Sequence, residues 1–370
     1  AEKQLEGTEF QLMKLRVAGT PTIAQWLGGQ LADSDSKEVG IDGKVVSVAY
    51  ARQVVDGLRG EGGLTLRTNF DPLAVVWTDR PSLPYNNKVE IQPVELAGES
   101  AEKKLALIRK ALRGLHTDGM LMSALDDVAW TLNLRGRDVH CNPVFLSYLL
   151  IAPERATLFI DRRKLTPEVE RYLSSVGVGV EEYAAVGKGL KDYFSYNILM
   201  DPKETGEVMP GYVDKHVKVV YADSPVPAMK AVKTDAEIKG FKAAMLRDGV
   251  AMVKFLRWLQ PAVEAGGQTE MSVDRKLTEL RAEQKRFRDI SFDTIAGYGP
   301  HGAIVHYEAL PETDVELRPE GFLLLDSGAQ YQDGTTDITR TIPLGPLTDE
   351  QCRIYTLVLK GHIRLAMAKF

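Results

Sequence analysis

Cysteine is scarce in this chain of 370 residues, which contains only Cys141 and Cys352. Two cysteines about 210 residues apart provide no disulfide framework and no cysteine-based zinc cluster, which favours a reducing compartment. No apolar run reaches the roughly 18 residues that a membrane-spanning helix requires, and residues 1–20 have no signal-peptide hydrophobic segment. The sequence therefore predicts a cytoplasmic protein without a membrane partner.

Blocks of charge of one sign are also lacking. The 46 lysines and arginines and the 51 aspartates and glutamates are scattered along the chain, and the net charge is −5. Without a basic stripe, the chain is not expected to bind nucleic acid. Hydrophobic residues make up 44% of the chain, which is enough for each of two or three domains to bury a core.

The pattern of predicted elements divides the chain into three domains. Short β runs alternate with helical stretches over residues 1–79 and again over residues 80–228, which predicts α/β structure. Residues 229–370 are typical of two helices, two hairpins and a final helix, an α+β order, with capping boxes beginning at Thr234 and Thr348. In the first of these helices one apolar face is expected, formed by Ile238, Phe241, Met245, Met252, Leu256 and Leu259.

Two aspartates of the third domain are predicted to converge. Residues 323–325 and 338–342 are β runs on either side of a turn at residues 332–334, so a hairpin would carry Asp326 and Asp337 toward each other. Two neighbouring carboxylates favour a shared cation, and oxygen ligands suit hard or borderline metal ions. The spacing alone is equally typical of a hairpin whose aspartates are exposed to solvent.

A second hairpin is predicted just before this one, from residues 291–296 and 303–307, with His306 near a strand end. His301 falls in the intervening turn and is interpreted as a loop residue. The other histidines lie in no recognisable motif, so ordinary surface or structural roles are predicted for His116, His140, His216 and His362.

Several segments together resemble the Xaa-Pro aminopeptidases (aminopeptidase P) of the pita-bread, creatinase-like metallopeptidase family. Two segments of the third domain, 302–307 and 326–341, carry the resemblance around the aspartates. It implies creatinase-like N-terminal α/β domains followed by a pita-bread catalytic domain. Further segments look like the three-domain, cytosolic-type members: residues 77–81, 133–136, 142–145 and 230–233.

The resemblance implies a site with two divalent metal ions, usually Mn²⁺, with Zn²⁺ or Co²⁺ as alternatives. Asp326 and Asp337 match two of its metal ligands, and His306 matches a catalytic histidine that hydrogen-bonds the substrate. Thr339, two residues after Asp337 on the same strand face, is expected to support the metal ligands. A substrate pocket formed by Phe292 and Ile295 is a hypothesis beside a plain core role for both. Arg340, on the opposite strand face, is expected to form a structural ion pair.

The implied activity is hydrolysis of the N-terminal Xaa-Pro bond of peptides by a metal-activated hydroxide, in a homodimer. Two alternatives stay open: a non-catalytic pita-bread domain that binds peptides or histones, and a relative that acts on dipeptides or a creatine-like bond. The family completes its metal site with a histidine and two glutamates downstream, and this sequence ends at Phe370. Both ends look truncated, so an incomplete pita-bread domain, with low metal occupancy and no activity of its own, is predicted.

Overall fold

The computed structural model describes residues 2–369, and for Lys3 the backbone only. The chain forms two compact units, each built from separate segments of the sequence. Within residues 2–369, no helix combines the length and apolar character needed to cross a bilayer. The first unit contains the chain up to Glu90 with Ala101–Leu134 and Phe145–Val232, and the second contains Ile91–Ser100, Arg135–Val144 and the chain from Lys233.

The first unit opens with a small α/β segment. The parallel pair β1 and β2 flanks α3, whose N-cap Ser47 accepts a hydrogen bond from the backbone N–H of Tyr50. This order confirms the β run, helix and β run predicted before residue 70. The elements are α1 (Glu2–Leu5), α2 (Ile23–Gln30), β1 (Glu38–Gly40), α3 (Val48–Arg59) and β2 (Thr65–Arg67).

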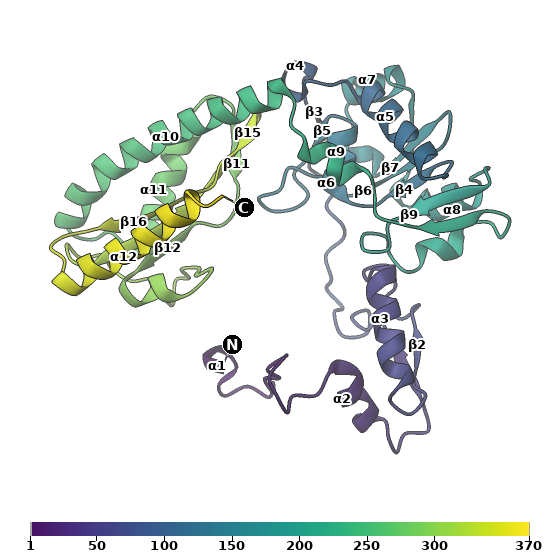
Figure 1. Ribbon diagram of the computed structural model, residues 1–370, viewed down its shortest axis with the longest axis horizontal. Helices are drawn as coiled ribbons and strands as arrows, with labels where there is room; N and C mark the ends of the chain where they lie inside the picture. Colours follow the sequence, from purple (N-terminus) through teal and green to yellow (C-terminus); the bar gives the residue numbers. More distant parts are fainter. Residues whose placement is uncertain (1, 370) are drawn as a thin grey trace. The chain divides into compact units, whose positions relative to one another are not determined.

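A six-stranded mixed sheet follows in the same unit, in the order β10-β9-β4-β6-β7-β8 (Figure 1). Strand β6 pairs antiparallel with β4 and β7, and the other pairs are parallel. Its core includes Leu121, Phe159 and Ile198. The strands are β4 (Met120–Met122), β6 (Ser147–Ile151), β7 (Ala156–Ile160), β8 (Val178–Glu181), β9 (Asn197–Met200) and β10 (Lys218–Tyr221). The helices are α5 (Ala101–Gly114), α6 (Leu125–Thr131), α7 (Pro167–Ser175), α8 (Val186–Lys191) and α9 (Val226–Ala231).

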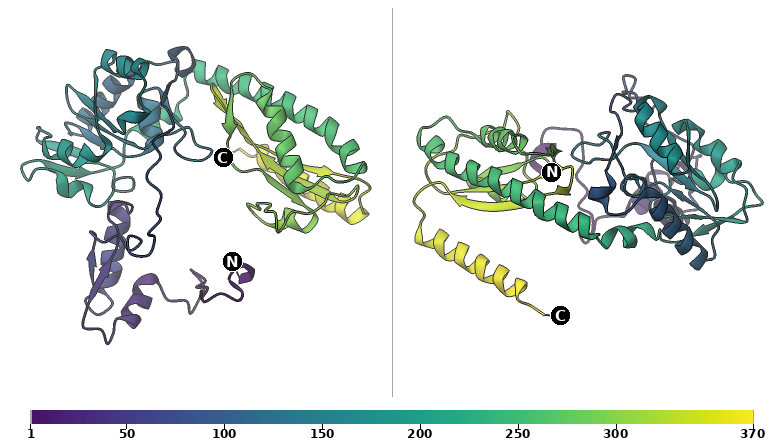
Figure 2. Two further views of the ribbon diagram at one scale, coloured as in Figure 1. Left: turned by 180° about the vertical axis from the view of Figure 1, so that it is seen from behind. Right: turned by 90° about the horizontal axis from the view of Figure 1, so that it is seen from above.

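Long helices and two three-stranded sheets make up the second unit. Helices α10 (Asp235–Glu264) and α11 (Glu270–Ala282) lie side by side (Figures 1 and 2), and α10 begins at the predicted capping box of Thr234. The sheet orders are β12-β13-β16 and β11-β14-β15. The strands are β11 (Phe287–Ile290), β12 (Ile295–Tyr298), β13 (Phe322–Ser327), β14 (Ala329–Tyr331), β15 (Gly334–Thr335) and β16 (Ile338–Pro343). The remaining elements include α4 (Val94–Ala97), the short strands β3 (Glu90–Ile91) and β5 (Leu134–Arg135), and α12 (Asp349–Ala366).

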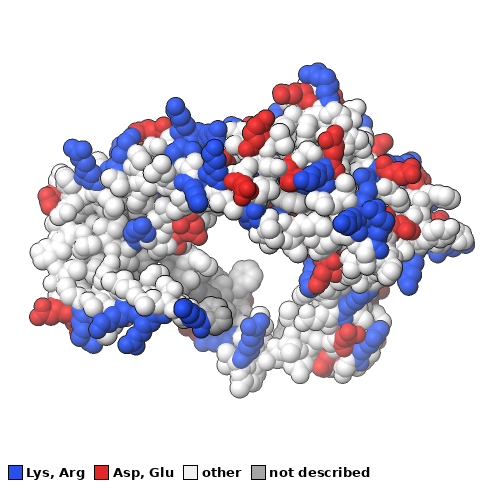
Figure 3. Space-filling view, turned by 45° about the horizontal axis from the view of Figure 1, so that its top comes forward, with Lys and Arg blue, Asp and Glu red and all other residues white. Residues whose placement is uncertain are grey.

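The core of this unit lies between α10, α11 and the sheet β12-β13-β16, with Phe255, Leu277 and Leu323 at most 1% exposed. The predicted second capping box is present at Thr348, where α12 begins. The structure thus has α/β character in the first unit and α+β character in the second, which confirms the predicted fold class. Over the face in Figure 3, lysine and arginine side chains lie among aspartates and glutamates.

The predicted apolar face of α10 is only partly right. Met252 and Leu259 are buried, but near the start of α10 the buried residues are the small Gly240 and Ala244, which lie against the hairpin of β14 and β15. At Gly240 a Cβ atom would lie 2.2 Å from the carbonyl oxygen of Asp333, so only glycine permits this close approach. The larger apolar residues expected on this face are exposed: Ile238, Phe241, Met245 and Leu256.

The predicted hairpin of residues 291–296 and 303–307 is wrong. The strand β12 begins only at Ile295 and pairs with β13. The chain then forms the 3₁₀ helix η4 (Gly299–Ala303), which has Pro300 near its start, and a turn follows. Pro300 has its φ fixed in the helical range, which favours η4 directly after β12, and residues 303–307 therefore follow a turn instead of returning along β12 as a strand.

Candidate metal centre

The strands β13 and β16 bring the two predicted aspartates together. They pair antiparallel, with Asp326 opposite Thr339, and Asp337 immediately precedes β16. This confirms the predicted pairing of the two β runs. At Gly328 an added Cβ would lie 2.0 Å from the carbonyl oxygen of Thr336, so the two segments come this close only because the residue is glycine.

The Asp326 and Asp337 carboxyl groups lie within hydrogen-bonding reach of each other, Asp326 half-buried and Asp337 exposed. Partial burial and the Asp326 carboxylate raise the pKa of the Asp337 carboxyl above its ordinary value. Two carboxylates in contact repel each other unless a proton or a cation lies between them. Their oxygen atoms suit hard or borderline divalent ions, so the pair fits the metal that the family resemblance implies.

The neighbouring strand residues surround Asp326. The hydroxyl of Thr339 donates a 2.8 Å hydrogen bond to Oδ1 of Asp326, which holds that carboxylate in one orientation. Ile295 lies directly opposite Asp326 on β12, and both Ile295 and Phe292 are half-buried. The ion pair expected for Arg340 is not found among residues 2–369. Its guanidinium instead donates a hydrogen bond to the carbonyl oxygen of Thr339 at 2.7 Å.

His306 lies in the turn after η4 rather than on a strand. Its side chain is exposed and its φ is +55°, a left-handed backbone conformation that is uncommon outside glycine. Within residues 2–369 it forms no hydrogen bond with Asp326 or Asp337. The helix η4 packs on β12 and β13, so the loop that carries His306 begins beside the strand that carries Asp326.

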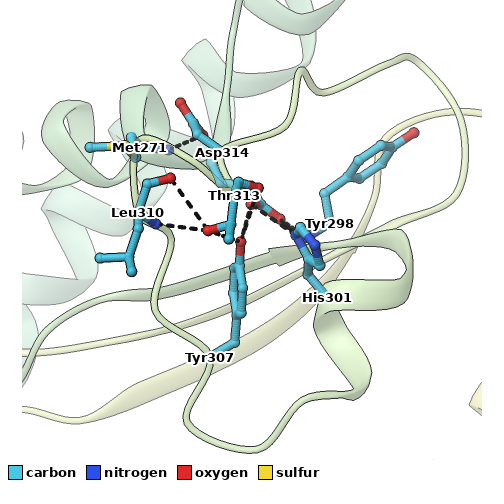
Figure 4. A network of polar contacts seen from close by, with 8 residues as sticks. Met271, Tyr298, His301, Tyr307, Leu310, Thr313 and Asp314 are labelled. Carbon is cyan, nitrogen blue, oxygen red and sulfur yellow. Dashed lines mark hydrogen bonds and ion pairs between the residues drawn. The ribbon is translucent and has the colours of Figure 1, made fainter. Parts of the chain in front are cut away.

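A buried glutamate holds this loop in place, and Figure 4 labels three residues that it contacts, Tyr298, His301 and Tyr307. The side chain of Glu270, at the start of α11, is 0% exposed and accepts hydrogen bonds from the backbone N–H of Tyr298 at 2.7 Å and from the Tyr307 hydroxyl at 2.8 Å. Nδ1 of His301 lies 3.0 Å from its Oε1. Burial raises the pKa of the Tyr307 hydroxyl, which keeps it protonated as a donor. Sequence patterns give no signal for this network because its residues are far apart in the chain.

Glu270→Gln should destabilise the loop that carries His306. The amide has one acceptor oxygen in place of two, so at least one of the donors around it loses its partner, at a cost of about 1–3 kcal/mol. We expect faster amide hydrogen exchange over residues 299–314 and a lower unfolding temperature. Glu279→Gln, at an exposed position of the same helix, is the matched control. Equal exchange in the two variants would contradict the role of Glu270.

Asp337→Asn should stabilise the metal-free protein at neutral pH. Because the pKa of Asp337 is raised in the fold, the folded state binds its proton more tightly than the unfolded chain does. The stability that this group contributes therefore falls as the pH rises above its ordinary pKa of 3.8. The gain should not exceed about 1 kcal/mol, because exposed charges are screened. Denaturant unfolding with a chelator should show a gain that shrinks as the pH approaches 3.8; a gain independent of pH would rule out the repulsion.

Family models match most of the chain. Residues 79–237 match the creatinase/prolidase N-terminal domain, and residues 239–370 match metallopeptidase family M24. The aspartate pair and its hairpin lie within the second match. The chain therefore contains a region that matches the creatinase/prolidase N-terminal domain, followed by a region that matches the M24 metallopeptidases.

Across both regions the chain is similar to proteins named Xaa-Pro aminopeptidases. It is 36% identical over 387 residues to the probable Xaa-Pro aminopeptidase P of Paracoccidioides lutzii, a match that covers 100% of this chain and 62% of that protein. It also superposes on the X-prolyl aminopeptidase of Caenorhabditis elegans, described as a cytosolic enzyme with a di-nuclear active site, with a TM-score of 0.87 and 31% identity. That match covers 97% of this chain and 59% of the other.

More distant structures share the fold alone. The Xaa-Pro dipeptidase of Bacillus anthracis superposes with a TM-score of 0.58 and 23% identity, over 72% of this chain and 71% of that one. The chain spans about three fifths of the length of the P. lutzii and C. elegans aminopeptidases that it matches.

Proposed function

We propose that this chain is part of a metal-dependent aminopeptidase that removes the first residue from peptides with proline in second position. The observation that supports it best is the contact between Asp326 on β13 and Asp337 just before the paired strand β16, inside the region that matches family M24. The Xaa-Pro aminopeptidases to which the chain is similar supply the substrate class.

In this proposal Asp326 and Asp337 are two of the ligands of a pair of divalent ions. The preferred ion is Mn²⁺, and Zn²⁺ or Co²⁺ are the alternatives. All three ions accept carboxylate oxygens as ligands. Bound there, the ions would supply Lewis-acid activation of water and of the scissile carbonyl. Thr339 would hold the Asp326 carboxylate in one orientation, because its hydroxyl donates a hydrogen bond to Oδ1 of Asp326.

The remaining site residues act on the substrate in this proposal. His306 would hydrogen-bond the substrate carbonyl region and hold or release a proton there, for which an imidazole is suited near neutral pH. Ile295, opposite Asp326, and the neighbouring Phe292 would contact the side chain of the first substrate residue. A residue followed by proline needs its own pocket, because the Xaa-Pro amide lacks an N–H and the proline φ is fixed.

The proposal also covers organisation and setting. We place domain boundaries near residues 80 and 229, so that two creatinase-like domains precede the pita-bread region. A homodimer in the cytoplasm is proposed by analogy with the family, and the C. elegans relative is described as cytosolic.

The test is peptide hydrolysis by the full-length protein loaded with Mn²⁺. It should release arginine from Arg-Pro-Pro and leave Arg-Ala-Pro intact, and a chelator should abolish the release. Mass spectrometry of the products distinguishes the outcomes. No release from Arg-Pro-Pro, or equal cleavage of both peptides, would contradict the proposed substrate class.

His306→Asn should lower kcat by about 10²–10⁴-fold, the usual contribution of a positioned acid–base group, while the metal content stays unchanged. Asparagine tolerates the positive φ at this position, so the backbone should be kept. The matched control is His116→Asn, because His116 is also exposed and has a φ of +54°. An unchanged kcat in the His306 variant would remove this residue from the proposed mechanism.

A further inference from the structure

A second cluster of metal-ligating side chains lies in the same unit as the aspartate pair. It consists of His140, Cys141 and Asp293, whose ligand atoms all lie within 4.8 Å of one another. Nε2 of His140 is 2.8 Å from Oδ1 of Asp293. None of these residues belongs to the metal centre proposed above. The sequence predicted only ordinary roles for His140, and Asp293 is 153 residues away from it.

The backbone around Cys141 is held in a defined turn. The N–H of Asn142 donates to the carbonyl oxygen of Val139 at 3.1 Å, and Cys141 has a φ of +59°, as the third residue of a type II turn requires. This turn presents the imidazole and the thiol side by side. A positive φ is rare for cysteine, so the surrounding structure has to stabilise it.

Gln330 of β14 supplies that stabilisation. Its Nε2 donates to the carbonyl oxygen of Cys141 at 2.9 Å, while its Oε1 accepts from the hydroxyl of Thr335 at 2.6 Å. The two hydrogen bonds orient the amide and tie the turn to the hairpin that follows Asp326. The cluster is therefore built on ordered backbone on both sides, because Asp293 lies two residues before β12.

The donor set differs in kind from the aspartate pair. One imidazole nitrogen, one sulfur and one carboxylate oxygen match the ligands of zinc and of similar borderline ions, whereas Mn²⁺ prefers oxygen. Asp289 and Glu308 act electrostatically on His140 and add negative charge around the cluster. His140 and Asp293 are exposed and Cys141 is half-buried, so an ion has access and a fourth position stays open to water.

A bound ion has to displace the thiol proton. Burial raises the pKa of Cys141 to about 11, so binding releases that proton, as at any thiolate site. The alternative for these residues is a His140–Asp293 hydrogen bond next to a free thiol, without metal. The two possibilities differ in whether an ion binds at these residues with the Cys141 sulfur as one of its ligands.

We propose that His140, Cys141 and Asp293 form a mononuclear site for a zinc-like divalent ion, separate from the aspartate pair. The site takes zinc, cobalt or cadmium, and leaves manganese to the carboxylates. The proposal does not depend on peptidase activity, because its evidence is the geometry and the chemistry of the three side chains.

Cobalt is the probe, because a cobalt–thiolate bond gives a charge-transfer band in the near ultraviolet and carboxylate ligands give none. The metal-stripped full-length protein carrying Cys352→Ser is titrated with Co²⁺. We expect a band that saturates at one equivalent per chain and disappears when Cys141→Ser is added. His140→Ala and Asp293→Asn should each weaken cobalt binding at least about tenfold, because even residues that only support a metal ligand usually cost that much.

Asp326→Asn is the matched control, since it should change the total cobalt bound but leave the charge-transfer band as it is. In a second measurement on the protein with both cysteines, Zn²⁺ should slow alkylation of Cys141 and leave the exposed Cys352 unaffected. Thermal unfolding in the absence of metal checks that the variants fold. The proposal is overturned if no band forms, if the band persists in Cys141→Ser, or if His140→Ala and Asp293→Asn bind cobalt as tightly as the parent.

Discussion

Asp337→Asn should abolish Xaa-Pro hydrolysis by the full-length protein, with a loss of roughly 10³-fold or more in kcat/KM. The substitution removes one of two carboxylates in contact and the negative charge that a divalent ion needs there. Metal content should therefore fall together with activity. The measurement is kcat/KM on Arg-Pro-Pro, combined with elemental analysis of the purified variant.

A graded series separates metal binding from folding. Thr339→Val removes the hydrogen bond to Oδ1 of Asp326 and should weaken metal binding about 10–100-fold, whereas Thr339→Ser keeps the hydroxyl and most of the affinity. Asp349→Asn, at an exposed aspartate of α12, should leave activity unchanged. A fully active Asp337→Asn enzyme with normal metal content would rule out the proposed metal centre.

Arg281→Met should destabilise the protein by about 3–5 kcal/mol, the usual cost of leaving one charge of a buried ion pair without its partner. Nε and Nη2 of Arg281 lie 2.7 and 3.0 Å from the carboxylate oxygens of Asp248, and both side chains are 0% exposed. The hydroxyl of Tyr331 donates to the same carboxylate at 3.1 Å. Chemical denaturation should show the loss as a lower midpoint.

The double variant Asp248→Leu with Arg281→Met is the decisive comparison. Removing both charges leaves no buried ion, so the pair of substitutions should cost less than the sum of the two single ones. Lys254→Met, which breaks the exposed ion pair with Glu283, should change the stability by no more than about 1 kcal/mol. Additive single effects would show that the ion pair is not a coupled unit.

The same ion pair contacts the backbone next to the aspartate pair. Nη1 of Arg281 lies 3.4 Å from the carbonyl oxygen of Gly328, the residue whose missing side chain lets the two aspartate segments approach. Tyr331, which also contacts Asp248, is the last residue of β14, directly before the turn of the hairpin. We therefore expect metal affinity to fall in Arg281→Met even where the variant is still folded.

Local features of the sequence predicted a large part of the second unit. The capping boxes at Thr234 and Thr348 begin helices, and the two β runs around the turn at residues 332–334 pair as expected. The α/β and α+β classes followed from the order of the elements. These features depend on residues that are near one another in the chain, so they can be predicted without knowledge of the packing.

Contacts between distant segments could not be predicted in this way. The strand predicted around His306 does not form, because the chain enters the 3₁₀ helix η4 directly after β12. Near the start of α10 the buried residues are the small Gly240 and Ala244, because the backbone of the hairpin packs there. A hydrophobic pattern identifies an amphipathic helix, but the neighbour it meets decides which of its faces is buried.

The sequence by itself predicted most of the elements, the two capping boxes, the hairpin that carries Asp326 and Asp337, and the resemblance to the family in which that hairpin occurs. Only the tertiary structure decided that Glu270 holds the His306 loop, that Asp248 meets Arg281, and that Asp293 meets His140. The physical reason is one of range. Turns, caps and strand register arise from interactions within a few residues, whereas buried polar partners are chosen by the packing of whole elements.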